Sequence, residues 1–192
     1  MRINEIFYSL QGEGAHTGRA AVFVRFSGCN LACRFCDTLH GTYREYSAEE
    51  VWREIAAFPS RHLVFTGGEP ALQLTAETVR FFKERGYYLQ VETNGTRPLP
   101  EGIDWITCSP KDAYCPGAEV KLGRADEVKV VFDGIIDPAK YLALPAACHT
   151  LQPCDTGDKY LNDKIVKQCV AYILDHPEWR LSLQTHKILN VQ

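Results

Sequence analysis

Short segments of β-branched and aromatic residues recur along the chain, and they constrain its fold more than any other feature. They are predicted to be strands buried on both faces, as in a parallel sheet. Parallel strands need long crossover connections, so helices are expected between them. The predicted strands are 21–26, 62–66, 87–93, 104–108, 127–132, 149–152 and 181–185.

Three helices are predicted in the connections. Ser47 and Glu50 form a capping box at the start of the first. Thr75 can cap the second, which ends at Gly86, a residue that adopts the left-handed conformation common at helix ends. Apolar residues at helical spacing predict the third over about 162–176.

Two connections lack a helical pattern, since residues 96–103 and 111–125 contain glycine and proline and no apolar periodicity. Alternating strands and helices predict an α/β fold with a parallel sheet, open or curled towards a barrel. The helix-poor connections indicate an abridged barrel of about six to seven strands, with short or missing helices in its second half. The 192 residues contain no repeat or linker, so one domain, 1–192, is expected.

The composition, with 45% hydrophobic and 23% charged residues, is that of a globular protein. A net charge of -3 supplies no basic surface for a phosphate backbone, so no nucleic-acid partner is expected. No stretch approaches transmembrane length, and residues 1–14 lack the continuous apolar run of a signal peptide, so a cytoplasmic protein without a membrane partner is expected. In that compartment its eight cysteines are expected to be metal ligands or free thiols rather than disulfides.

Cys29, Cys33 and Cys36 directly follow the predicted strand 21–26, and the other cysteines lack their spacing. In α/β folds cofactors bind at the carboxyl ends of strands. Three thiolates at this spacing can bind three irons of a 4Fe-4S cluster and leave the fourth iron open. Two alternatives stay open: a structural zinc site completed by His40, and chance proximity among the cysteines.

The three cysteines and the turn 65–70, FTGGEP, together resemble the radical S-adenosylmethionine superfamily. Gly67 and Gly68 let the backbone approach a ligand closely, and Glu69 would stabilise structure or charge nearby. The resemblance implies that this turn binds the methionine amino group. Without the family resemblance, the polar residues at the other strand ends would be interpreted simply as turns that end the strands. The further implied cofactor contacts are Phe35, Cys36, Asp37, Glu92, Asn94, Ser109, Pro110, Lys111, Gln152, Pro153, Cys154 and Asp155.

The segment 5–14, EIFYSLQGEG, narrows the resemblance. Its polar and glycine residues indicate a binding loop rather than a strand, although on its own it would equally suit a hairpin turn beside an edge strand. With Arg25, the sequence 36–38 (CDT) and the ending 183–187 (LQTHK), it resembles the 7-carboxy-7-deazaguanine synthase family. That family contracts the ring of 6-carboxy-5,6,7,8-tetrahydropterin to 7-carboxy-7-deazaguanine with loss of ammonia, on the pathway to deazapurines such as queuosine.

The same resemblance implies how the substrate is held. Gln11 and the backbone at Leu10 and Gly12 can hydrogen-bond to the amide edge of a pterin. The Arg25 guanidinium can bind the pterin carboxylate through two N–H donors. Thr38 is implied as the protein ligand of Mg²⁺, an ion that needs few protein ligands, although it could also cap a short helix. Glu13 is a candidate for contact or proton transfer. The implied substrate contacts are Leu10, Gln11, Gly12, Glu13, Arg25, Thr66, His186 and, through its terminal carboxylate, Gln192.

The resemblance further implies a flavodoxin or ferredoxin as electron donor, and a homodimer. Two other functions remain open. A radical enzyme that installs a glycyl radical in a partner protein would share the cysteines and the GGEP turn but need no pterin loop. A zinc or iron-sulfur binding module would carry the cysteines without any turnover.

Overall fold

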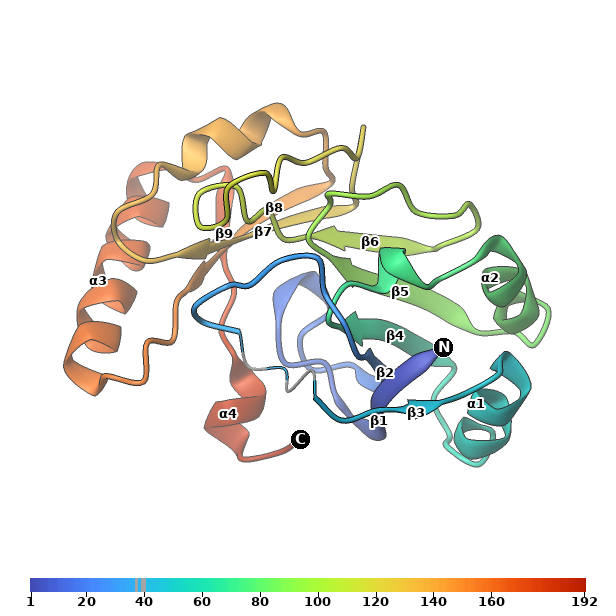
Figure 1. The fold of residues 1–192 in the computed structure, drawn as a ribbon. Helices are drawn as coiled ribbons and strands as arrows, with labels where there is room; N and C mark the ends of the chain where they lie inside the picture. The colour runs from blue at the N-terminus through green and yellow to red at the C-terminus, as the bar shows by residue number, and fades with distance from the viewer. Residues whose placement is uncertain (37, 39–40) are drawn as a thin grey trace.

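A computed structural model describes residues 1–36, 38 and 41–192, so Asp37 and His40 lie outside the described residues. The strands form one nine-stranded sheet, in the order β3-β1-β2-β4-β5-β6-β7-β8-β9 (Figure 1). The strands are β1 (Arg2–Leu10), β2 (Ala20–Phe26), β3 (Arg44–Glu45), β4 (His62–Gly67), β5 (Tyr88–Thr93), β6 (Trp105–Cys108), β7 (Glu127–Phe132), β8 (Cys148–Pro153) and β9 (Trp179–Leu181). The α-helices are α1 (Ala48–Ile55), α2 (Ala76–Lys83), α3 (Lys159–Asp175) and α4 (Thr185–Leu189).

Seven of these strands run parallel: β2 pairs with β4, and each strand from β4 to β9 pairs with the next. β1 is antiparallel to both β2 and β3. The sheet curls, and α1, α2 and α3 lie on its outer side (Figure 1). This arrangement confirms the predicted abridged α/β barrel, with antiparallel strands added at one edge.

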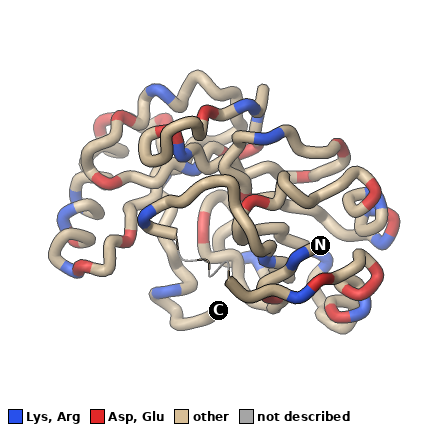
Figure 2. The backbone as a smooth tube through the Cα atoms, in the orientation of Figure 1, with Lys and Arg blue, Asp and Glu red and all other residues tan. Residues whose placement is uncertain are grey.

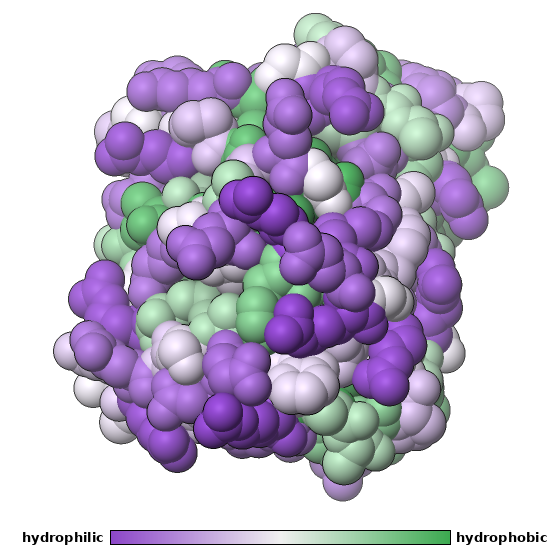
Figure 3. Space-filling model, turned by 90° about the vertical axis from the view of Figure 1, so that its right-hand side faces the viewer, coloured by the Kyte–Doolittle hydropathy of each residue, from purple (hydrophilic) through white to green (hydrophobic). Residues whose placement is uncertain are grey.

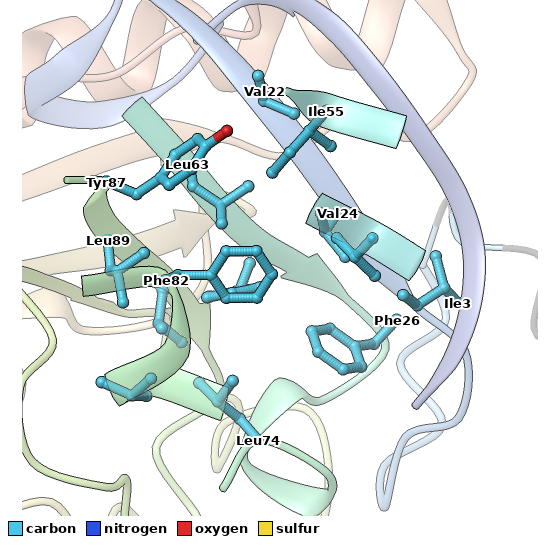
Figure 4. Packing of buried hydrophobic residues seen from close by; sticks show 14 residues of the cluster. Ile3, Val22, Val24, Phe26, Ile55, Leu63, Leu74, Phe82, Tyr87 and Leu89 are labelled. Carbon is cyan, nitrogen blue, oxygen red and sulfur yellow. The ribbon is translucent and has the colours of Figure 1, made fainter. Parts of the chain in front are cut away.

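One buried cluster fills the space between the first strands of the barrel and the helices α1 and α2 (Figure 4). Ile55 of α1 and Phe82 of α2 are fully buried there, together with Val24 and Leu63 of the sheet. Each such side chain contributes about 1.5–3 kcal/mol by leaving water. The amphipathic faces of the two helices are therefore what attaches them to the sheet.

A second buried cluster attaches α3 to β7 and β8. Ile165 and Cys169 of α3 pack there with Val130 and Leu151, and none of the four is more than 2% exposed. α3 begins at Lys159, earlier than the predicted residue 162, because the Asp158 side chain caps it by accepting a hydrogen bond from the Leu161 amide at 2.9 Å.

The other predictions for the connections are confirmed. Ser47 accepts a hydrogen bond from the Glu50 amide, and the Glu50 side chain accepts one from the Ser47 amide, which completes the capping box of α1. Thr75 caps α2, and Gly86 beyond its end has a φ of 77°. Residues 96–103 and 111–125, all of them described, contain no helix.

Two predictions are wrong near the ends of the chain. Residues 5–10 of the predicted loop belong to the strand β1, because Ile3 and Phe7 are buried and the strand pairs with β2 along most of its length. The last strand is Trp179–Leu181 rather than 181–185. Beyond it the chain turns away from the sheet and Thr185 begins α4, because residues 184 and 185 bond to the loop that follows β1.

Charged residues of both signs occur along α1, α2 and α3 (Figure 2). The face that carries α1 and α2 is mostly hydrophilic, with apolar patches in the hollows between polar side chains (Figure 3). Among the described residues, no helix combines the length and the apolar character that crossing a membrane requires.

The capping box predicts the effect of Ser47→Ala. This change removes the acceptor for the Glu50 amide and should lower the free energy of unfolding by about 1 kcal/mol, measured by urea unfolding of the apoprotein. Glu101→Ala, at an exposed turn residue, is the control and should leave the midpoint unchanged. Equal midpoints for Ser47→Ala and the wild type would contradict the role of the cap.

Candidate active site

The carboxyl ends of the parallel strands surround a cavity of about 280 Å³. Side chains from the loops after β1, β2, β4, β5 and β6 meet there with the carboxyl-terminal segment. The cavity therefore brings together most of the predicted site. The predicted residues that line it are Leu10, Gln11, Gly12, Glu13, Arg25, Cys29, Cys33, Phe35, Cys36, Thr38, Thr66, Gly67, Gly68, Glu92, Asn94, Ser109, Lys111, Gln152, His186 and Gln192.

Five predicted residues lie around this cavity without lining it. Glu69 is fully buried and accepts hydrogen bonds from the Asn94 amide and the Thr93 hydroxyl, both at 2.7 Å, so it braces the end of β5. Asp155 instead bonds to Lys187 at 2.6 Å and ties α4 to the loop after β8. Direct contacts with a cofactor stay predictions for these five, which are Glu69, Pro110, Pro153, Cys154 and Asp155.

The thiols of Cys29, Cys33 and Cys36 all line the cavity, and none of the three is in a disulfide. Among the described residues no three such groups converge as a single ion would require, whereas the thiolates of a cluster each bind a different iron. The Cys29 sulfur accepts a hydrogen bond from the Leu31 amide at 3.4 Å, a contact that suits a thiolate ligand. The donor set therefore fits an iron-sulfur cluster.

The GGEP turn packs directly against the loop that leads to the cysteines. The Gly68 amide donates to the Phe26 carbonyl, and the Glu69 amide donates to the Gly28 carbonyl, each at 2.9 Å. A Cβ at Gly68 would collide with the Gly28 backbone, and Gly67 has a φ of 99°. The two glycines are therefore needed because the loop after β4 comes close to the loop after β2. This requirement holds whether or not a ligand is bound.

Lys129 of β7 is the centre of a buried ionic network under the cavity. Its ammonium lies 2.6 Å from Glu13 Oε2 and 2.8 Å from Glu92 Oε2, and its side chain is 6% exposed. Gln11 donates to Glu92 Oε1 at 3.3 Å, and Gln184 donates to Glu13 Oε1 at 2.8 Å. The network joins the loop after β1 to β5, β7 and the carboxyl-terminal segment.

Burial and nearby charges shift the pKa values of these groups in opposite directions. Burial raises the pKa of the Glu13 carboxyl, but attraction to Lys129 and hydrogen bonds from Lys129 and Gln184 lower it to about 2. For Glu92 burial prevails and its pKa is raised. Burial lowers the pKa of Lys129, but the carboxylates of Glu13, Glu92 and Glu127 outweigh it and raise that pKa. Glu13 and Lys129 are therefore both charged at neutral pH.

Arg25 is held at the other side of the cavity by an ion pair. Its Nε lies 2.7 Å from Glu5 Oε1, while the side-chain amide of Gln192 donates to Glu5 Oε2 at 2.7 Å. The rings of Phe7 and Phe23 stack beside it, with centroids 4.8 Å apart. The guanidinium thus faces the cavity from an orientation that Glu5 determines.

The carboxyl-terminal segment lies against the loop of residues 11–13. The amide and hydroxyl of Thr185 both donate to the Gly12 carbonyl at 2.9 Å. The imidazole of His186 lies so close that a Cβ at Gly12 would collide with it. Gly12 is therefore the position that lets His186 reach the cavity.

Seven residues that line the cavity were not predicted: Phe7, Phe23, Leu31, Thr93, Lys129, Val131 and Gln184. Four of them had a signal in the sequence. Lys129 is the one cation in the mostly apolar strand 127–132, EVKVVF, which indicates a side chain that faces the inside of a barrel. Phe7 and Phe23 pair across β1 and β2, which becomes visible only when residues 5–10 are recognised as a strand. Gln184 lies within 183–187, a segment recognised for His186 alone.

Comparison with known proteins agrees with this geometry. Residues 23–113 match the radical SAM superfamily, so the chain is a radical S-adenosylmethionine enzyme. The 7-carboxy-7-deazaguanine synthase of Bacteroides thetaiotaomicron is 49% identical over 191 residues, which span 100% of this chain and 98% of that relative. The enzyme of the same name from Nitratidesulfovibrio vulgaris is 42% identical and spans 99% of this chain and 98% of its own. This chain belongs to the 7-carboxy-7-deazaguanine synthase family.

A solved structure extends the likeness to the fold. The crystal structure of QueE from Escherichia coli has a TM-score of 0.76 and 28% identity, over 95% of this chain and 92% of that chain. A 4Fe-4S cluster and S-adenosylmethionine are accordingly the cofactors of this enzyme, and the alternative of a structural zinc site is set aside.

The buried network predicts a pH-dependent effect of Lys129→Met. The wild-type Glu13 carboxylate stabilises the fold fully above the ordinary carboxyl pKa of 4.5, and this contribution is lost as pH falls towards its pKa of about 2 in the folded protein. Without Lys129 two carboxylates are buried unpaired, so the variant should lose about 3 kcal/mol or more of unfolding free energy at pH 7. The loss should shrink in acid, as the orphaned carboxyls protonate.

Urea unfolding of the apoprotein at pH 7 and near pH 4 measures the loss of unfolding free energy at each pH. Lys121→Met is the matched control, since Lys121 is exposed and should tolerate the change at both pH values. A loss in Lys129→Met that is the same at both pH values would contradict the electrostatic explanation.

Proposed function

We propose that this enzyme converts 6-carboxy-5,6,7,8-tetrahydropterin to 7-carboxy-7-deazaguanine with release of ammonia. The observation that carries the proposal is that one cavity joins the three cysteines to the loop of residues 11–13, to Arg25 and to His186. The named relatives support the same reaction, since they share nearly the full length of this chain.

Cys29, Cys33 and Cys36 would hold the cluster, with one iron free to bind S-adenosylmethionine. A cluster held there would supply the electron for reductive cleavage of S-adenosylmethionine. The strand ends after β4, β5 and β6 would orient the cofactor through backbone and polar groups. Because these groups belong to neighbouring strands and line the same cavity as the cysteines, they would hold the cofactor beside the cluster.

The protein's own groups suit the pterin at the opposite end. Gln11 and the backbone of Leu10 and Gly12 can pair with the amide edge of the ring. Arg25, which Glu5 orients, can bind the carboxylate of the pterin through two parallel N–H donors. The Phe7 and Phe23 rings beside it offer an apolar surface to the flat ring system.

Glu13 suits a binding role better than that of a base. Its carboxylate is held ionised by Lys129, with a pKa of about 2, so it accepts hydrogen bonds well and takes up a proton poorly at neutral pH. We therefore assign its Oε atoms to the N–H groups of the pterin. Thr66 and His186, which line the same cavity, would contact the substrate from β4 and α4.

Thr38 is proposed to hold Mg²⁺ through its hydroxyl, because the residue lines the cavity, as Cys36 does. A magnesium ion keeps most of its ligands as water or substrate oxygens, so one protein hydroxyl can position it near the substrate carboxylate. The chain would act as one radical SAM domain in a cytoplasmic homodimer and take its electrons from a flavodoxin or ferredoxin.

The assignment is tested with anaerobically reconstituted enzyme, dithionite, S-adenosylmethionine and the carboxytetrahydropterin. We expect 5'-deoxyadenosine and 7-carboxy-7-deazaguanine, both measured by chromatography and mass spectrometry. Cys33→Ala should abolish both products, whereas Cys169→Ala, which removes a buried thiol of α3 far from the cysteine loop, should retain them. Deoxyadenosine without the deazaguanine product would refute the substrate and favour a rival such as a glycyl-radical activase.

The magnesium site is tested separately by Thr38→Ala. Loss of the hydroxyl should raise the Mg²⁺ concentration needed for half-maximal rate by about tenfold or more, while cleavage of S-adenosylmethionine alone stays intact. Thr42→Ala, at an exposed threonine of the same connection, is the control. If Thr38→Ala kept the magnesium response of the wild type, the hydroxyl would not be the ligand.

A further inference from the structure

A fourth cysteine stands beside the cluster ligands. The sulfur of Cys115 lies 3.6 Å from the sulfur of Cys33, although the two residues are 82 positions apart in the sequence. Cys115 is 8% exposed, and it belongs to the connection between β6 and β7 rather than to the cysteine loop. Neither the reaction nor the cluster ligation described above uses this thiol.

The position of Cys115 is determined by its own turn. Its amide donates to the Lys111 carbonyl at 2.8 Å, and the Ala118 amide donates to the Cys115 carbonyl at 3.2 Å. The neighbouring Tyr114 packs edge-on against Phe35 of the cysteine loop, with centroids 4.8 Å apart, and its hydroxyl donates to the Val131 carbonyl at 2.9 Å. The two loops are thus packed together independently of the sulfur contact.

The chemistry of the Cys33 and Cys115 sulfurs decides which of them donates the hydrogen bond. When Cys33 ligates iron it is a thiolate without a proton, so it can only accept. The Cys115 thiol then becomes the donor of an S–H···S hydrogen bond. Hydrogen bonds to the sulfurs of an iron-sulfur cluster stabilise the reduced form, because reduction adds negative charge that the donor proton offsets.

We propose that the Cys115 thiol donates a hydrogen bond to the Cys33 thiolate of the cluster, and that this bond makes the cluster easier to reduce. Cys115 is a positioning residue that acts through Cys33, and its effect falls on the electron entry that precedes all later chemistry. We assign Cys115 this role rather than that of a fourth ligand, because the three cysteines leave the fourth iron for S-adenosylmethionine.

The test is a potentiometric titration of the reconstituted enzyme, monitored by electron paramagnetic resonance without pterin, so its outcome is independent of the substrate proposed above. In Cys115→Ala the ratio of reduced to oxidised cluster at a fixed potential should fall about tenfold, which is 59 mV for a one-electron couple. Cys115→Ser keeps a donor and should recover most of the loss. Cys169→Ala, another buried thiol, should match the wild type.

A spectroscopic measurement tests the bond itself. Electron-nuclear double resonance of the reduced cluster, compared in H₂O and D₂O, should show one exchangeable proton coupling that Cys115→Ala lacks. An unchanged ratio and an unchanged coupling in Cys115→Ala would overturn the proposal. So would loss of iron from both Cys115 variants with Cys169→Ala intact, because Cys115 would then be needed to hold the cluster rather than to tune it.

Discussion

Seven parallel strands can form one curled sheet only if every connection returns along its outside, and the rest of the structure depends on that constraint. All carboxyl ends then emerge on one side, where loops far apart in sequence become neighbours. The cysteine loop follows β2, the GGEP turn follows β4 and Asn94 follows β5, yet all three line one cavity. Their relative positions are fixed by strand register, which loops alone could not achieve.

The same geometry makes the inside of the barrel polar, and a buried charge there needs partners. Lys129 is neutralised by Glu13 and Glu92, which come from different elements, so the ion pairs that offset its desolvation also attach the amino-terminal loop to the sheet. Gln184 extends the attachment to the carboxyl-terminal segment. The ionised state of Glu13 is consequently a property of the assembled site.

Much of the fold and of the candidate site could be predicted from the sequence, because the patterns that indicate them involve residues that are close together in the chain. The capping box of α1, the strands β2 and β4 to β8, and the cysteine loop after β2 each depend on a few adjacent residues, and the structure has them where the sequence predicts. The errors concern tertiary pairing. Residues 5–10 form a strand because β2 pairs with them, and Thr185 begins a helix because the loop at Gly12 bonds to it. Lys129 and Cys115 escaped prediction for the same reason, since their partners lie 116 and 82 residues away.

The groups that line the cavity suit reductive chemistry. Around the sulfurs there are hydrogen-bond donors: the Leu31 amide and the Asn94 side chain at Cys29, and the Cys115 thiol at Cys33. The carboxylates of Glu13 and Glu92 line the same cavity and would oppose an incoming electron if they were unpaired. Lys129 cancels much of their field. The enzyme can therefore keep an anionic, hydrogen-bond-accepting pocket for its substrate close to a site that must itself accept negative charge.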